Sequence, residues 1–327
     1  MTSSIRWLAR TVLLLLMLTS CLVGSEAAAA GYPTKPIRLI VPFPPGGATD
    51  LAARVFAQPL AAALGQPVVI ENKAGADGAI AALEVMRAAP DGHTLFFATN
   101  TAMCGVPTLR KAPPYDPITD FTPVSMIGRY GFFLFLHPGV PAEDVKTLLA
   151  YIRANPGKLN YGTGTSTAIV ASAQLKLLEK LDAIQIPYKG DGPLTTDLMA
   201  GHIQFAFMTP GAAMSQVAAG RLRILATLLP ERSALAPRVP TMAEAGIPKL
   251  SVIPWAAIFG PAKMSPEIVQ RLAQLTSDIV ARTDIRESLG RYAIEAQSSR
   301  PNELEAFLKA QLDAWRRTVR EVGIEPD

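Results

Sequence analysis

Two glycine-containing turns near the start of the chain have the residue types that bind an anion. The first, Gly46-Gly47-Ala48-Thr49-Asp50, follows an apolar run at residues 37–43, and the second, Gly75-Ala76-Asp77-Gly78, follows another at 68–70. Each lies where a strand is expected to end and a helix to begin. Backbone N–H groups at a helix N-terminus are unpaired and carry a partial positive charge. Two such turns facing one cleft predict a site for a small carboxylate that needs no arginine.

A third turn adds hydroxyl groups. Thr163-Gly164-Thr165-Ser166-Thr167 lies between an expected strand and an expected helix. One of these hydroxyls is expected to cap the helix, and the others can bind a ligand. Two charged residues have two interpretations each. Asp50 either caps a helix or binds a ligand ammonium group, and Lys189 either supplies positive charge to the cleft or is a solvated turn residue.

We predict that the ligand-binding residues come from these turns and from two neighbouring positions. They are Phe43, Gly46, Gly47, Thr49, Asp50, Gly75, Ala76, Asp77, Gly78, Thr101, Thr163, Thr165, Ser166, Thr167 and Lys189.

The sequence offers little for catalysis or for a cofactor. His93, His137 and His202 lie far apart without metal-ligand spacing, and no Walker A or Gly-x-Ser-x-Gly sequence occurs. We therefore predict no catalytic residue, no metal and no cofactor. Cys104 is expected to be a small packing residue. A secreted hydrolase that uses Ser166 or Cys104 is an alternative from another class, but no pattern places a histidine beside either residue.

The composition is that of a globular protein with more than one core. The chain has 327 residues, of which 49% are hydrophobic and 18% charged, which excludes a disordered chain and favours two domains. Its formal net charge is +4 without a long Lys/Arg run, so nothing indicates nucleic-acid binding.

Residues 1–30 have the pattern of an export signal. Arg6 and Arg10 precede an apolar run at 12–18, and Ala28-Ala29-Ala30 offers a cleavage site. The apolar run is too short to span a membrane. Leu18-Thr19-Ser20-Cys21 also has the form of a lipoprotein signal, so lipidation of Cys21 is the alternative. Either route predicts a periplasmic protein, which we expect to be a monomer.

Expected strands and helices alternate from residue 36, which predicts an α/β fold with two mostly parallel sheets. The helix that Thr49 or Asp50 caps is expected to stop at Gly65 and to kink or end early at Pro59. The proline-rich residues 105–123 are expected to form a loop. The expected strands are 37–43, 67–71, 94–98, 132–136, 159–161, 183–187, 203–207, 222–228, 256–259 and 292–295. The other expected helices are 78–89, 142–154, 167–180, 192–200, 211–219, 266–282 and 301–322.

The order of these elements predicts two lobes joined by two crossings of the chain. Residues 31–128 and 254–327 are expected to form lobe 1, and residues 129–253 lobe 2. Ligands in such sheets bind at the carboxyl ends of the strands, where the glycine turns lie.

The chain resembles a known family in several ordered segments. The opening 32–54 carries Pro42-Phe43-Pro44-Pro45-Gly46-Gly47 followed by Asp50, and is similar to the opening of the Bug proteins, the extracytoplasmic solute receptors of tripartite tricarboxylate transporters. The resemblance continues through segments that span nearly the whole chain. These segments are 65–72, 90–95, 114–124, 187–190, 197–201, 220–223 and 239–246.

The resemblance implies a two-lobed periplasmic binding protein of the type II-like Venus flytrap kind. It implies that backbone amides and ordered waters bind a small organic, aromatic or amino-acid carboxylate between the lobes. The closed protein would then deliver this ligand to integral-membrane permease subunits. A receptor that feeds a two-component sensor kinase is the alternative within the same fold.

Three segments depart from the family pattern near the expected cleft. Residues 163–170 form a shorter hydroxyl loop without a following histidine, residues 104–109 replace the usual Asn-Pro segment, and Phe207-Met208 replaces Phe-Asp. Loss of a polar residue at Met208 predicts a less polar pocket, which favours an apolar or aromatic acid.

Overall fold

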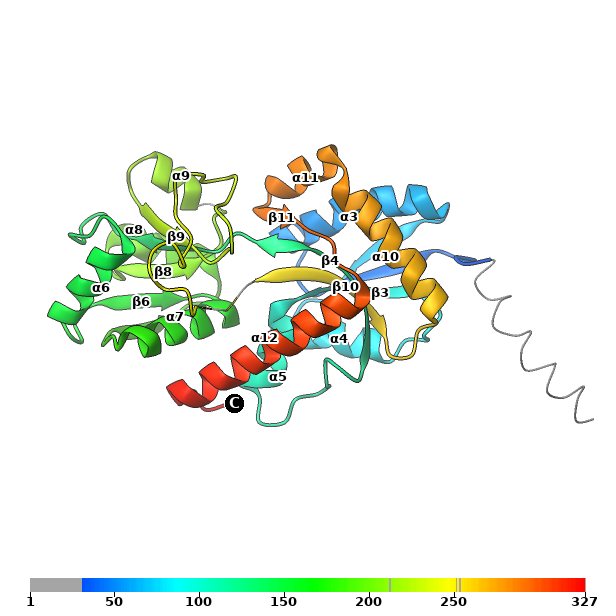
Figure 1. Ribbon diagram of the computed structural model, residues 1–327, viewed down its shortest axis with the longest axis horizontal. Coiled ribbons are helices and arrows are strands. Elements are labelled where there is room, and N and C mark those ends of the chain that lie inside the picture. Colours follow the sequence, from blue (N-terminus) through cyan, green and yellow to red (C-terminus); the bar gives the residue numbers. More distant parts are fainter. Residues whose placement is uncertain (1–30, 212, 251, 253, 327) are drawn as a thin grey trace, which may run out of the picture.

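The chain forms two α/β lobes, each built on its own sheet (Figure 1). A computed structural model of the protein describes residues 31–211, 213–250, 252 and 254–326. The predicted export signal and Cys21 lie outside the described residues. Within the described part, no helix combines the length and the apolar character needed to cross a bilayer.

The first sheet has six strands in the order β11-β4-β10-β3-β1-β2. Strands β1, β2 and β3 pair in parallel, whereas β10 is antiparallel to both β3 and β4, and β11 is antiparallel to β4. The strands are β1 (Ile37–Val41), β2 (Val68–Asn72), β3 (Thr94–Thr99), β4 (Phe121–Tyr130), β10 (Trp255–Pro261) and β11 (Ile294–Ala296).

The second sheet has five strands in the order β7-β6-β8-β5-β9. Strand β6 is parallel to β7 and β8, and β5 is antiparallel to β8 and β9. The strands are β5 (Phe133–Leu136), β6 (Asn160–Thr163), β7 (Ile184–Pro187), β8 (Phe205–Met208) and β9 (Arg223–Thr227).

Both sheets are therefore mixed, and the prediction of mostly parallel sheets was wrong in this respect. The parallel strands come from consecutive strand–helix–strand units. Strand β4 leaves the first lobe and β10 returns to it, so these two strands are antiparallel to each other, and β10 is antiparallel to β3 as well. Strand β4 continues to Tyr130 in the first sheet, past the predicted lobe boundary at residue 128.

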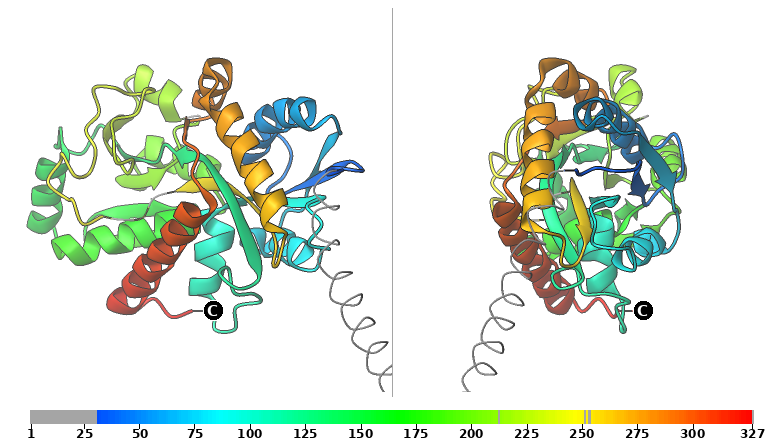
Figure 2. Two further views of the ribbon diagram at one scale, coloured as in Figure 1. Left: turned by 45° about the vertical axis from the view of Figure 1, so that its right-hand side comes forward. Right: turned by 90° about the vertical axis from the view of Figure 1, so that its right-hand side faces the viewer.

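Helices flank both sheets, as the turned views in Figure 2 show. The helices of the first lobe are α3 (Ala48–Leu64), α4 (Ala79–Met86), α5 (Val106–Leu109), α10 (Pro266–Ala281), α11 (Thr283–Gly290) and α12 (Pro301–Val322), with short turns η1 (Ala76–Gly78) and η2 (Thr101–Gly105). Those of the second lobe are α6 (Val145–Ala154), α7 (Ser166–Glu179), α8 (Asp191–Ala200) and α9 (Ala213–Ala218). The sequence did not predict α11.

Helix α3 differs from its prediction at both its start and its middle. Its N-cap is Gly47, not Thr49 or Asp50, and it runs through Pro59 to the predicted stop at Gly65. Proline removes one helical hydrogen bond but has a helical φ. Because Phe56 and Leu60 are buried in the lobe 1 core on either side of it, packing holds the helix together across that lost bond.

The predicted loop 105–123 instead contains ordered elements. Turn η2 is a π-helical turn that leads into α5, and β4 begins at Phe121. Pro107 lies in the first turn of α5, where proline is tolerated. Pro123 lies within β4 beside an irregularity in its pairing with β10, which is one of the few places a strand accepts proline.

Helix α12 ties the two lobes together. It packs against β4 and η2 of the first lobe and against α7 of the second, and Figure 1 shows it slanting below both. One hydrophobic cluster contains Phe96 and Phe259 of the first sheet, Leu134 and Phe205 of the second, and Trp315 of α12. The lobes therefore share a core on the side of α12.

We expect Trp315→Ala to lower the free energy of unfolding by about 3–5 kcal/mol, because the fully buried indole leaves a cavity in this shared core. Urea denaturation measures the change. Arg317→Ala, an exposed neighbour on the same helix, is the control and should stay within about 0.5 kcal/mol of the parent. A loss at Trp315 no larger than that of the control would contradict a shared core.

Candidate functional site

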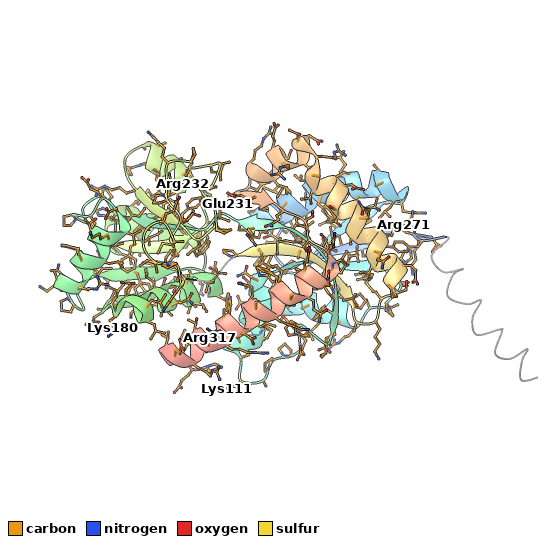
Figure 3. The ribbon with its side chains drawn as sticks, in the orientation of Figure 1. Lys111, Lys180, Glu231, Arg232, Arg271 and Arg317 are labelled. Atoms are coloured by element: carbon orange, nitrogen blue, oxygen red, sulfur yellow. The ribbon has the colours of Figure 1, made fainter. Side chains whose placement is uncertain are left out.

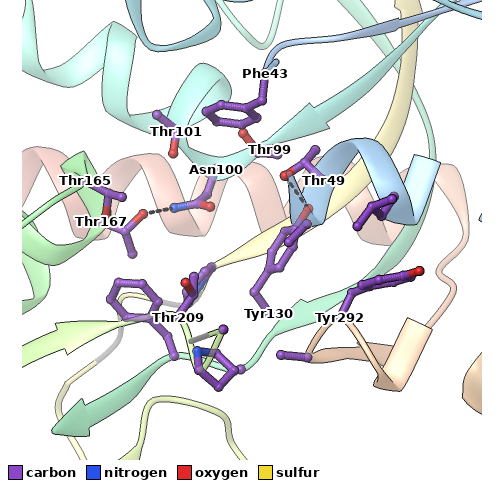
Figure 4. Close-up of a pocket in the computed structure, with 18 of the residues that line it drawn as sticks. Phe43, Thr49, Thr99, Asn100, Thr101, Tyr130, Thr165, Thr167, Thr209 and Tyr292 are labelled. Atoms are coloured by element: carbon purple, nitrogen blue, oxygen red, sulfur yellow. Dashed lines mark hydrogen bonds between the residues drawn. The ribbon is translucent and has the colours of Figure 1, made fainter. Parts of the chain in front are cut away.

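A cavity of about 410 Å³ lies between the lobes. Figure 4 shows its lining side chains. The lining residues come from both sheets' ends and from the chain crossings: Phe43, Ala48, Thr49, Leu51, Thr99, Asn100, Thr101, Tyr130, Gly131, Phe132, Thr165, Thr167, Thr209, Pro210, Gly211, Met214, Leu235, Pro254, Arg291, Tyr292 and Ala293. The volume is that of a pocket for a small molecule.

Helix α3 begins at the cavity. Ala48 and Thr49 in its first turn line the wall, and no side chain caps the helix, so its first N–H groups have no partner within the helix. The Thr49 Oγ1 lies 3.0 Å from the Tyr130 hydroxyl, and either oxygen can be the donor. Burial raises the pKa of Tyr130, although its contact with Thr49 opposes the shift. Tyr130 therefore remains a neutral hydroxyl, available as a donor.

The end of strand β3 contributes three consecutive polar side chains. Thr99, Asn100 and Thr101 all line the cavity where β3 passes into η2. The Thr99 hydroxyl is buried and has no hydrogen-bond partner among the described residues. A buried unpaired hydroxyl costs free energy unless a water or ligand binds it.

Asn100 connects the two lobes across the cavity. Its Nδ2 donates to Thr167 Oγ1 at 2.7 Å, and its Oδ1 accepts from the backbone N–H of Trp255 at 3.4 Å. Thr167 belongs to the first turn of α7, so a second helix N-terminus meets the cavity here. Thr165 caps this helix by accepting from the N–H of Ala168 at 3.2 Å. Since both threonine oxygens accept a hydrogen bond, each hydroxyl proton is free to donate into the cavity.

The two segments in which the chain passes between the lobes, near residues 130–132 and at Pro254, line the cavity. The N–H of Tyr130 donates to the carbonyl of Pro254 at 2.9 Å, so the two crossings are joined to each other. The N–H of Gly131 donates to the carbonyl of Ala293 at 2.6 Å, which holds the first crossing against the turn before β11. Gly131 and Ala293 therefore keep the first crossing fixed beside the pocket.

The rest of the lining is apolar and almost without charge. Phe132, Met214, Leu235, Pro210 and Pro254 cover the side toward the second lobe. Arg291 is the one charged residue among the described lining residues. Figure 3 shows the labelled Lys180, Arg271 and Arg317 on the outside of the lobes instead.

The apolar character does not come from Met208, as the sequence had suggested. Met208 is fully buried in the core of the second lobe, where its Sδ lies 3.6 Å from the Thr195 hydroxyl. It is the residue after Met208, Thr209, that reaches the cavity. Alternation of side chains along a strand puts these two neighbours on opposite faces.

Five of the predicted ligand-binding residues line the cavity: Phe43, Thr49, Thr101, Thr165 and Thr167. Ten others do not: Gly46, Gly47, Asp50, Gly75, Ala76, Asp77, Gly78, Thr163, Ser166 and Lys189. Their direct contribution to ligand binding stays a prediction.

Asp50 is engaged within the first lobe. Its carboxylate accepts from the N–H of Gly46 at 2.9 Å, from Nε of Arg54 at 2.9 Å and from Nδ2 of Asn72 at 2.9 Å. Burial would raise the pKa of this carboxyl, but the hydrogen bonds from Arg54, Gly46 and Asn72 outweigh it and the pKa is lowered. Asp50 therefore stabilises the first glycine turn from within the first lobe. It is not the N-cap of α3, and it does not line the cavity, where an ammonium group would bind.

The second glycine turn supports the end of β3. A Cβ on Gly78 would come within 2.9 Å of the Pro42 Cβ and 3.1 Å of the Ala102 Cβ, so glycine permits this close approach. Gly78 also has φ +90°, which L side chains rarely adopt. The turn thus packs beneath Ala102, next to Thr101, and holds η2 in place.

The remaining predicted residues of the second lobe face elsewhere. Thr163 accepts from Nε2 of Gln185 at 2.9 Å on the neighbouring strand, and Ser166 is buried beside Gly105. Lys189 is exposed on the turn before α8.

Among the described residues, no histidine is hydrogen-bonded to either nucleophile of the hydrolase alternative. Cys104 is fully buried, and burial raises the pKa of its thiol, which disfavours the reactive thiolate. Among the described residues, no hydrogen bond joins Ser166 or Cys104 to a histidine, and no three His, Cys, Asp or Glu side chains gather as a metal site would need.

Several lining residues were not predicted. Thr99 and Tyr130 end β3 and β4, and Asn100 and Thr209 directly follow β3 and β8. The sequence does not show which strand ends meet. The signal that could have found Asn100 and Thr99 is their position next to Thr101, at the carboxyl end of a parallel strand. Phe132, Leu235 and Tyr292 come from crossings and loops, whose approach to the cavity depends on the packing of the two lobes.

A ligand-sized cavity between two α/β lobes, at the ends of their strands, is the architecture of a two-lobed ligand-binding protein. Residues 52–324 match the tripartite tricarboxylate transporter family receptor. The chain belongs to this family.

Related sequences and structures agree with this assignment. BugT of Bordetella pertussis is 33% identical over 304 residues, which cover 92% of this chain and 93% of BugT. An R. palustris protein solved with adipate is 30% identical, with a TM-score of 0.78 over 90% of this chain and 100% of its own. MatC of Rhodopseudomonas palustris, solved with bound malate, is 28% identical, with a TM-score of 0.73 over 88% of this chain and 100% of its own.

We expect Asp50→Asn to lower the free energy of unfolding at neutral pH by about 2 kcal/mol, because a buried charged hydrogen-bond network loses its charge. The pKa of Asp50 is lowered in the folded state, so its contribution is present above the unfolded pKa of about 3.9 and is lost as the pH falls through the folded value. The difference between variant and parent should therefore shrink below about pH 4.

Urea unfolding at several pH values measures this dependence. Asp182→Asn changes an exposed carboxylate and serves as the control. A difference between Asp50→Asn and the parent that does not change with pH would contradict the role given to the Asp50 charge.

Proposed function

We propose that this chain captures a small carboxylate between its lobes and delivers it to the membrane subunits of a tripartite tricarboxylate transporter. The observation that carries the proposal is the convergence of two helix N-termini and a set of hydroxyl groups on one cavity. The N-termini are those of α3 and α7, and the hydroxyls include Thr49, Thr101 and Thr167.

These groups suit a carboxylate because they supply hydrogen-bond donors without a full positive charge. First-turn N–H groups and hydroxyls can surround two carboxylate oxygens at fixed positions, and the helix dipoles favour the negative charge. Several such bonds, at about 1.5–3 kcal/mol each, are enough for micromolar binding, which needs about 8 kcal/mol after ordering costs.

The apolar side of the cavity favours a ligand with an apolar body, organic or aromatic. Phe132, Met214 and Leu235 would cover such a body, and no charged lining residue faces them except Arg291. The adipate and malate bound by related proteins support the choice of a carboxylate. We place the carboxylate at the helix N-termini and the body against the aliphatic and aromatic side chains.

Binding by both lobes would favour the closed form. A ligand that contacts α3 and α7 together makes its full set of bonds only when the lobes are close, so it shifts the population toward closure. The Asn100–Thr167 hydrogen bond already joins the lobes across the pocket. A closed surface is what the membrane subunits would recognise.

The proposal includes export to the periplasm. Residues 1–30 would direct it, with cleavage after Ala30 or lipidation at Cys21. If Cys21→Ser left processing and membrane association unchanged, the lipidation route would be rejected.

A titration of the purified protein without residues 1–30 tests the carboxylate proposal. Benzoate, 3-phenylpropanoate, adipate, malate and citrate are the probes, with thermal shift first and calorimetry on those that stabilise. A carboxylate at about 100 times its Kd should add about 2.7 kcal/mol of stability. Thr167→Val and Thr101→Val should each weaken binding about tenfold, since each removes one hydrogen-bond donor.

Thr196→Val is the matched control, because Thr196 lies exposed on α8 and does not line the cavity. Its affinity should equal that of the parent. Folded, ligand-free protein that binds none of the probes, or the same affinity in all three variants, would contradict the proposal.

A further inference from the structure

The Thr209 hydroxyl lines the cavity, but its proton is donated to a carboxylate of the second lobe. Thr209, directly after β8, donates its hydroxyl proton to Oδ2 of Asp191 at 2.6 Å. Its backbone N–H donates to the same oxygen at 3.0 Å. A hydroxyl has one proton, so Thr209 can offer the cavity only its lone pairs.

Asp191 is fixed in this position by its surroundings. It begins α8 and is largely buried, and this burial raises the pKa of its carboxyl although the two bonds from Thr209 oppose the shift. Its Oδ1 is buried without a hydrogen-bond partner among the described residues. A Cβ on Gly164 would come within 2.9 Å of that oxygen, so the carboxyl packs directly against the backbone of the hydroxyl loop.

Two other hydroxyls of the cavity have the opposite polarity. Thr165 and Thr167 already accept hydrogen bonds from Ala168 N–H and Asn100 Nδ2, so their protons are free to donate. Figure 4 shows Thr209 and Thr101 on different sides of Asn100. The cavity therefore combines a donor-rich wall with one obligate acceptor.

We propose that Thr209 selects, among carboxylates, those that also carry an N–H or O–H donor, and that Asp191 positions the Thr209 hydroxyl for this. The inference rests on the proposed function. A ligand without such a donor would leave the Thr209 lone pairs without a ligand partner in the cavity, and this lowers its affinity.

Matched acids that differ only in the donor test the proposal. One series is 3-phenylpropanoate, 3-phenyllactate and phenylalanine, which carry at the same carbon a hydrogen, a hydroxyl or an ammonium group. The other is 4-methoxybenzoate, 4-hydroxybenzoate and 4-aminobenzoate, in which the donor lies at the far end. Calorimetry on the purified protein gives the ratio of Kd values within each series.

We expect at least one donor-bearing acid to bind about tenfold more tightly than its matched acid, a difference of about 1.4 kcal/mol. Thr209→Val should reduce this ratio to near one, and Thr209→Ser should restore it. The hydroxy and amino members of each series distinguish a neutral from a cationic donor.

Variants of Asp191 test whether its carboxylate orients the Thr209 hydroxyl, with the same ratio of Kd values as the measurement. Asp191→Ala frees the Thr209 proton to point into the cavity, so the ratio should fall although the Thr209 hydroxyl remains. Asp191→Asn keeps an oxygen that accepts from Thr209 and should retain the ratio. Thr101→Val is the control within the cavity, since it should weaken both members of a pair and leave their ratio unchanged.

The outcomes separate the two proposals. If no carboxylate binds, the proposed function fails. If carboxylates bind and Thr101→Val weakens them, yet no pair shows a donor preference or Thr209→Val leaves the ratio intact, the inference about Thr209 is overturned and the proposed function stands.

Discussion

The organisation of this protein depends on unpaired backbone N–H groups at the starts of helices that point into a closed space. Each helix leaves its first N–H groups without partners, and water or a ligand must satisfy them. In α3 no side chain takes this role, and in α7 Thr165 satisfies a single N–H. A cavity that almost lacks charged side chains strengthens the attraction of these groups for an anion, because the local dielectric is low.

Residues of the first lobe stabilise the turn before α3 and the end of β3. Asp50 anchors the first glycine turn through Gly46, Arg54 and Asn72. Gly78 permits the second turn to pack under Ala102, beside the end of β3. Residues that an inspection of the sequence would place in direct contact with a ligand thus stabilise the backbone next to the cavity.

The two lobes are separate sheets but not separate cores. Helix α12 and the cluster around Trp315 join them, and the Asn100–Thr167 hydrogen bond joins them beside the cavity, close to Gly105, where Ser166 and Trp315 both lie. Glu295 of the first lobe also accepts a hydrogen bond from Ser233 of the second lobe. If the cavity opens, as the proposed function requires, these polar contacts would break while the shared core stays packed.

Much of this architecture follows from local sequence patterns, and the exceptions have physical causes. Helix α12 and the stop of α3 at Gly65 were predicted because amphipathic periodicity and a left-handed glycine are local signals. Strand β4 was missed because Pro123 and the proline-rich segment before it conceal a strand whose stability comes from pairing with β10 and β11. In the site, Thr49, Thr165 and Thr167 were predicted from their turns. Thr209 and Leu235 were not, since only the packing of the lobes brings them to the cavity.

A crystal structure of the protein with the tightest-binding carboxylate tests the central claim most directly. The account predicts carboxylate oxygens within hydrogen-bond distance of first-turn N–H groups of α3 or α7 and of a cavity hydroxyl, with the ligand body against Phe132 and Leu235. A carboxylate bound instead to Arg291, with its body toward the helix N-termini, or a ligand that contacts one lobe alone, would contradict it.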